Sequence, residues 1–158
     1  MENDFLKDLG FLGVTARLKR LSDKLSYSIK ELYSENLIDI EPSWHLVFLL
    51  LKKKKQSTMT EIAESLHLSQ PAMTKMINRM SKKNYIEVIR DSNDKRKKIL
   101  QLSSKAKREL PRFEVIWAAG ENSIREILKA NLAFLDSLAE FEEQIDSKSF
   151  KDRALNYL

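Results

Sequence analysis

The sequence predicts a mostly α-helical protein with one small β-hairpin. Apolar residues recur every three or four positions over long stretches, which is the pattern of helices that bury one face. The 158 residues include only three Gly and three Pro, too few turn residues for a protein built of many short strands. Residues 85–102 differ from the rest, because β-branched and aromatic residues flank a polar turn there.

Residues 1–36 are predicted to form one long helix. Its apolar stripe runs from Leu6 to Leu32, and Gly10 and Gly13 weaken the helix locally. A helix with such a stripe needs a surface to bury it. Packing within the monomer and packing on a second subunit both satisfy that need.

A linker is expected at residues 36–41, and Pro42 should start a helix over 43–54. The predicted buried face of this helix comprises Trp44, Val47, Phe48 and Leu51. A lysine run at 52–55 closes the helix, where cations suit the helix dipole. Contact with phosphate is the functional alternative for these lysines.

Two short helices joined by a tight turn are predicted next. The first spans 61–66, with Thr60 as its expected N-cap. Ser69 should cap the second, because its hydroxyl can accept from free N–H groups of the first turn. Pro71 falls in that turn, where its missing N–H costs nothing. The buried face of this second helix is predicted to comprise Met73, Met76, Ile77 and Met80.

A two-stranded hairpin should follow. Residues 85–89 and 99–102 are rich in residue types that favour strands. Asp91-Ser92-Asn93-Asp94, between them, consists of residue types that favour turns. Three helices, two of them joined by a short turn, followed by a hairpin make a winged helix-turn-helix, assigned here to residues 42–102. The wing tip spans Arg90 to Lys98 and is strongly basic.

Two more helices are predicted after the hairpin. The first runs over about 105–130, with Ser103 or Ser104 as its cap, and Pro111 near its start is a point where it could bend or break. The second runs over about 132–146. Both carry apolar residues at helical spacing.

Charge is segregated along the chain. Residues 52–112 hold 17 Lys or Arg against 6 Asp or Glu, a net of +11, and the remainder holds 11 against 17, a net of −6. A net charge of +5 spread evenly over the chain would be explained by basic residues that only solvate the surface. A basic segment that coincides with a helix-turn-helix and wing indicates a nucleic-acid-binding surface.

Several function classes are disfavoured. The chain has no Cys, two His and no Gly-rich phosphate loop, so we expect no catalytic residue, no metal site and no cofactor. The longest apolar run, residues 46–51, is far shorter than the roughly 20 residues of a membrane span. The first residues do not form a signal peptide. We therefore expect a cytoplasmic protein with no membrane association.

The order of elements resembles the MarR family of bacterial transcription regulators over essentially the whole chain. The family's wing pattern is matched by Asp94-Lys95-Arg96 and by the turn Leu102-Ser103-Ser104-Lys105-Ala106, in which Ser103 and Ala106 depart from the family's Thr and Gly. The resemblance implies a single domain over 1–158, with 1–36 and 105–158 as the helical dimerisation region. It also implies a homodimer in which each subunit places its recognition helix in a major groove of double-stranded DNA and its wing at a minor groove.

A closer resemblance concerns two segments. LGFLGVTARLKRLSDKL and PRFEVIWAA look like the MarR-type half of proteins that fuse such a module to a GNAT acetyltransferase domain. We expect the regulatory half only, and no enzymatic activity is carried over. A winged helix that binds protein, for example as the partner of an acetyltransferase, is the alternative function, although it gives no reason for a basic wing.

The second of the two short helices, at about 69–83, is the predicted recognition helix. The predicted DNA-binding residues lie on its exposed side and on the wing. Side chains of these types suit base edges in the major groove and neighbouring phosphates. They are Ser69, Gln70, Thr74, Lys75, Asn78, Arg79, Lys82, Arg90, Lys95, Arg96 and Lys97.

A small-molecule effector is implied by the family resemblance. The site would lie between the terminal helices and the winged-helix core, and core packing is the alternative for most of its residues. The predicted lining is Tyr27, Tyr33, Trp44, His45, Phe113 and Trp117.

Overall fold

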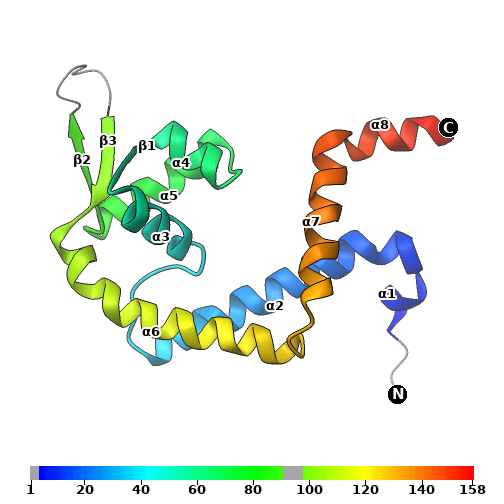
Figure 1. The fold of residues 1–158 in the computed structure, drawn as a ribbon, viewed down its shortest axis with the longest axis horizontal. Helices are drawn as coiled ribbons and strands as arrows, with labels where there is room; N and C mark the ends of the chain where they lie inside the picture. Colours follow the sequence, from blue (N-terminus) through cyan, green and yellow to red (C-terminus); the bar gives the residue numbers. More distant parts are fainter. Residues whose placement is uncertain (1–3, 91–97) are drawn as a thin grey trace. The chain divides into compact units, whose positions relative to one another are not determined.

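The structure is a computed structural model that describes residues 4–90 and 98–158. Figure 1 shows the helices and the small sheet in chain order. They are α1 (Phe5–Asp8), η1 (Gly10–Gly13), α2 (Val14–Glu35), α3 (Trp44–Lys54), β1 (Gln56–Thr58), α4 (Met59–Ser65), α5 (Gln70–Lys82), β2 (Ile86–Arg90), β3 (Lys98–Leu102), α6 (Ser104–Ile127), α7 (Leu132–Ser147), α8 (Phe150–Ala154) and η2 (Leu155–Tyr157). The predicted class, mostly α with a small β wing, is confirmed.

The chain divides into two compact units, residues 1–115 and 116–158. The first unit holds α1, η1, α2, α3, α4, α5, the sheet and the start of α6. The second unit holds the rest of α6, together with α7, α8 and η2. The single domain assigned from the sequence stays a prediction.

The single helix predicted for residues 1–36 is wrong. Gly10 adopts φ +53°, a left-handed conformation that ends α1, and the 3₁₀ turn η1 follows before α2 begins. At Gly13 the backbone passes so close to the Leu6 carbonyl that a Cβ atom would collide with it. The short α1 is tied back by Asp4, whose carboxylate accepts two hydrogen bonds from Arg20, at 3.0 and 2.8 Å.

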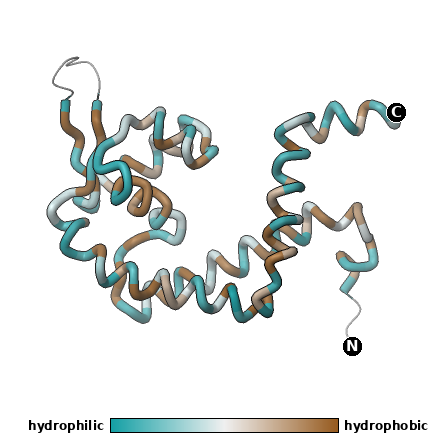
Figure 2. Tube along the Cα trace, viewed as in Figure 1, coloured by the Kyte–Doolittle hydropathy of each residue, from teal (hydrophilic) through white to brown (hydrophobic). Residues whose placement is uncertain are grey.

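The core of the first unit forms where α3, α5, the sheet and the start of α6 meet. The predicted buried face of α3 is confirmed, since its four side chains are at most 1% exposed. Figure 2 shows this concentration of hydrophobic residues on α3. The largest side chains in this core are aromatic and meet edge to face, with ring centroids 5.5–6.2 Å apart. They are Trp44, Phe48, Tyr85 and Phe113.

The first helix of the helix-turn-helix begins earlier than predicted. Thr58, not Thr60, is the N-cap of α4: its hydroxyl accepts from the Glu61 N–H at 3.2 Å, and the Glu61 carboxylate accepts from the Thr58 N–H at 2.8 Å. This is a capping box of the form Thr-x-x-Glu. Because it satisfies two N–H groups at once, it outcompetes Thr60, which has no acceptor partner three residues on.

The sheet has three strands, not two. β1 pairs with β3, with Ser57 opposite Leu100, and β3 pairs with β2, with Val88 opposite Leu100, in the order β1-β3-β2. All pairs are antiparallel. β1 is only three residues long, too short for a period-two pattern to show in the sequence.

The helices after the wing are close to the prediction. Ser103 caps α6 by accepting from the Ala106 N–H at 3.0 Å, and its own hydroxyl donates to the Asn84 carbonyl at 2.6 Å. α6 continues through Pro111 without a break. Asn131 caps α7, accepting from the Ala133 N–H at 3.1 Å. Among the described residues, no helix is both long enough and apolar enough to cross a lipid bilayer.

We predict that Tyr85 makes the fold sensitive to alkali. Burial, together with the nearby Asp39 and Glu109 carboxylates, raises the pKa of the Tyr85 phenol to about 12. The folded state therefore holds the phenolic proton more tightly than the unfolded chain does. This stabilisation is present below pH 10 and is lost as pH rises from about 10 to about 12. It amounts to at most about 3 kcal/mol.

Urea unfolding of the wild type and Tyr85→Phe at several values between pH 9 and 12 measures this contribution. The free energy of unfolding of the wild type should fall more steeply than that of Tyr85→Phe. Parallel curves would show that the phenol titrates normally.

Candidate nucleic-acid interface

The recognition helix α5 is fixed at its start by local chemistry. The Ser69 hydroxyl accepts from the Ala72 N–H at 3.4 Å, which confirms it as the N-cap, and Pro71 occupies the first turn. One side of the helix packs inward through Met73, Ile77 and Met80, none more than 2% exposed. Met76, also predicted to be inward, is half-buried.

The side of α5 opposite these residues faces solvent. Successive residues turn by about 100° around a helix, which places Lys75, Asn78 and Lys82 at the middle of the exposed face. Gln70 lies at its N-terminal end, and Ser69 is exposed beside it. No acidic residue occurs between Ser69 and Asn84. The face can donate hydrogen bonds and carries positive charge.

The two flanks of this face contact the rest of the unit. Thr74 lies on one flank, where its hydroxyl is 3.2 Å from the Met59 sulfur at the start of α4. Arg79 lies on the other flank and forms an ion pair with Glu41. Both side chains were predicted to contact DNA, and both are held by protein partners as well.

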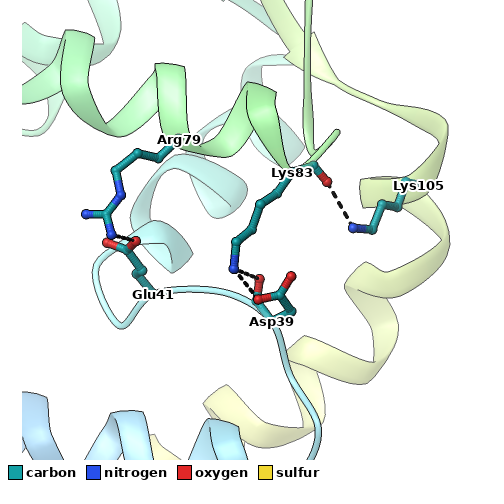
Figure 3. A network of polar contacts seen from close by, with 5 residues as sticks. All are labelled: Asp39, Glu41, Arg79, Lys83 and Lys105. Carbon is teal, nitrogen blue, oxygen red and sulfur yellow. Dashed lines mark hydrogen bonds and ion pairs between the residues drawn. The ribbon is translucent and has the colours of Figure 1, made fainter.

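The flank of Arg79 is the site of a polar network that no local pattern in the sequence predicted. Figure 3 shows two carboxylates of the linker between α2 and α3 facing the end of α5: Glu41 pairs with Arg79, and Asp39 pairs with Lys83. The Lys105 ammonium, at the start of α6, donates to the Lys83 carbonyl at 2.9 Å. The alternation of Ile38 and Ile40 with acids was the available signal for a fixed, half-buried linker.

The strands of the wing carry further cations. Arg90 ends β2 and pairs in register with Lys98 at the start of β3, and both are exposed. Across the sheet the side chains of Gln56, Gln101 and Glu87 form a row, joined by hydrogen bonds of 3.1 Å. Lys95, Arg96 and Lys97, predicted as DNA contacts, lie outside the described residues.

The predicted effector residues do not share one environment. Trp44, Phe113 and Tyr33 are buried, whereas Tyr27 is 65% exposed. His45 Nδ1 lies 2.6 Å from the Pro42 carbonyl.

Trp117, the sixth predicted effector residue, belongs to the second unit. A hollow in the first unit is lined by other residues, namely Leu51, Lys52, Lys55, Gln56, Gln101, Leu102, Lys107 and Leu110. The effector site therefore stays a prediction.

Within residues 4–90 and 98–158, no three His, Cys, Asp or Glu residues are grouped to hold an ion. The first unit offers a cationic, hydrogen-bonding face on α5, followed in the chain by the two strands of a wing. That geometry defines a winged helix-turn-helix protein.

Comparison with known proteins shows what part of the chain is similar to a known family. The MarR family model matches residues 40–98, from the end of the linker to the start of β3. The comparison with curated protein sequences found no match. The predicted resemblance to the MarR family of winged helix-turn-helix regulators is confirmed over residues 40–98, which contain α3, α4, α5 and β2.

Solved structures share the fold over most of the chain. A MarR mutant from E. coli complexed with operator DNA is 20% identical, with 87% of this chain and 96% of that chain covered and a TM-score of 0.67. The S. aureus MepR–DNA complex is 17% identical, with 84% and 97% covered and a TM-score of 0.74. The transcriptional repressor CouR, bound to a 23-mer DNA duplex, is 24% identical, with 82% and 89% covered and a TM-score of 0.66. At these identities the likeness is one of fold.

We predict different effects for two substitutions on this surface. Asn78→Ala should reduce discrimination between a preferred and a scrambled duplex by roughly 1–3 kcal/mol, the value of a good bidentate base contact. Arg90→Ala should weaken binding to both duplexes about equally, because a wing cation meets backbone phosphates. Fluorescence-anisotropy titrations with duplexes selected from random DNA would measure both. Equal losses on the two duplexes for Asn78→Ala would remove it from the base-reading residues.

Proposed function

We propose that this protein is a DNA-binding transcription regulator that acts as a homodimer on a near-palindromic operator. The observation that carries the proposal is the exposed face of α5, which combines amide, hydroxyl and cationic groups without a carboxylate of its own. Solved structures of the same fold include complexes of MarR, MepR and CouR with DNA. Repression is the proposed mode of action.

The proposed contacts divide into two groups. Gln70, Thr74, Lys75, Asn78 and Arg79 lie along the exposed side of α5, where they would read base edges or reach adjacent phosphates. The sugar–phosphate contacts are assigned to Ser69, Lys82, Arg90, Lys95, Arg96 and Lys97. Phosphate contacts set register and orientation, and base contacts carry the sequence preference.

Unburied apolar surface supports the homodimer. In the second unit, α7 leaves six apolar side chains 37–69% exposed: Leu132, Phe134, Leu135, Leu138, Phe141 and Ile145. In the first unit, Phe5, Phe11 and Leu12 are 70–99% exposed. Monomeric proteins rarely expose apolar patches of this extent, and a two-fold dimer buries the same patch on both copies.

Further parts of the proposal rest on the resemblance to the MarR family and on the charge distribution. Residues 42–102 would be the DNA-binding region, with 1–36 and 105–158 as the dimerisation region. A small molecule would tune binding, the protein would act in the cytoplasm, and no enzymatic activity is proposed. The alternative, a winged helix that binds a protein partner such as an acetyltransferase, gives no reason for a net charge of +11 over residues 52–112.

We predict that binding to duplex DNA depends steeply on salt. Each phosphate neutralised by Lys or Arg releases condensed counterions, so log K falls with log salt at about 0.9 per contact. Titrating a labelled duplex at several salt concentrations between 50 and 200 mM tests this prediction. A flat response would favour the protein-binding alternative.

We also predict a dimer whose recognition helices lie about one helical turn apart, roughly 34–36 Å. Sedimentation of the free protein tests the assembly, and Leu138→Glu, on the exposed side of α7, should shift it towards monomer. A full palindrome should bind far more tightly than a half-site. A stable monomer at micromolar concentration that binds both duplexes equally would contradict this architecture.

A further inference from the structure

The last turn of α5 and its C-cap carry cations that the linker neutralises. Residues 70–83 hold four cations, at Lys75, Arg79, Lys82 and Lys83, and no acid. Two of the four pair with linker carboxylates, Arg79 with Glu41 and Lys83 with Asp39 (Figure 3). The linker thus removes about half of the net charge that the helix would otherwise present.

The linker holds these carboxylates in place because its buried isoleucines alternate with its acidic residues. Ile38 and Ile40 are each 6% exposed and anchor the segment in the core, so Asp39 and Glu41 project from its other side. The Ile38 N–H donates to the Tyr33 carbonyl at 2.8 Å, and the Arg112 guanidinium donates to the Asn36 carbonyl. Little chain entropy remains to be lost when Glu41 pairs with Arg79.

The paired cations remain within reach of solvent. The Arg79 side chain is 53% exposed and Glu41 is 31% exposed, so the ion pair lies at the surface beside Asn78 and Lys82. An exposed ion pair contributes little to stability, which makes a purely structural role a weak explanation. A phosphate approaching this flank of α5 would compete with Glu41 for the same guanidinium.

We propose that Glu41 is an intramolecular competitor of DNA phosphate for Arg79, so that the linker limits the affinity of the recognition helix for DNA. The proposal rests on the DNA-binding function proposed above. A guanidinium whose charge is balanced by a carboxylate releases few counterions on meeting a phosphate. DNA affinity therefore depends on where the linker, which follows directly on α2, holds its two acids.

The test is a double-mutant cycle on full-length protein with a labelled duplex. Glu41→Gln keeps the size of the side chain and removes its charge. It should tighten binding several-fold, to at most about eightfold at 0.1 M salt, and should steepen the salt slope by about 0.9. In the Arg79→Gln background the same change should give no gain, because the released cation is absent.

Two controls separate competition from other effects. Glu121→Gln removes one negative charge from an exposed pair with Arg125, within α6 rather than α5, and should leave the slope unchanged. Asp39→Asn releases Lys83 and should repeat the gain independently of Glu41. Circular dichroism and thermal unfolding of each variant confirm that it is folded.

The outcomes are distinguishable. Weaker or unchanged binding by folded Glu41→Gln would overturn the proposal and assign the Glu41–Arg79 pair to positioning of α5. A gain that persists without Arg79 would also overturn it, since the effect would then be a general change in charge. Absence of DNA binding by the wild type would instead overturn the proposed function.

Discussion

The burial of one side of α5 is the constraint on which the DNA-facing surface depends. Met73, Ile77 and Met80 are at most 2% exposed, and complete burial of such side chains is worth about 1.5–3 kcal/mol each. Their removal from water fixes the rotation of the helix about its axis. The opposite side, with Lys75, Asn78 and Lys82, must then face solvent. Packing of the interior therefore determines which polar side chains are offered to a partner.

A cluster of aromatic rings lies in the core of the same unit. Phe48 contacts both Tyr85 and Phe113 edge to face, with ring centroids 5.5 Å apart in each case. These rings come from α3, the start of the wing and α6, so one cluster joins three segments that are distant in sequence. Lys105 lies 4.0 Å from the Tyr85 ring centroid and also donates to the Lys83 carbonyl. The end of the recognition helix is thereby linked to the core.

Electrostatics at the two ends of α5 differ. The N-terminal end is satisfied locally by the Ser69 hydroxyl, and Gln70 beside it is exposed. The C-terminal end carries cations, which suit a helix dipole, and two of them face the linker carboxylates. Positive charge on the exposed face is therefore concentrated at Lys75 and Lys82. The wing cations Arg90 and Lys98 add to it from the sheet.

The sequence by itself determined the features that arise from neighbours along the chain. Ser69 as a cap, the inward positions of α5 and the start of α6 at Ser103 depend on spacings of three or four residues, which a sequence displays directly. The Thr58–Glu61 capping box was equally local, and a search for Thr-x-x-Glu finds it.

Only the tertiary structure decided the rest. Asp39 and Lys83 are 44 positions apart, and Gln56 and Gln101 are 45 apart, so no local pattern pairs them. The break in the N-terminal helix at Gly10 also depends on a contact between residues that are distant in sequence. A glycine only weakens a helix, and the return of the chain, with Asp4 reaching Arg20, turned that weakness into a bend. Ion pairs, the third strand and the bend all depend on which segments the core brings together, because burial of apolar surface has no direction along the sequence.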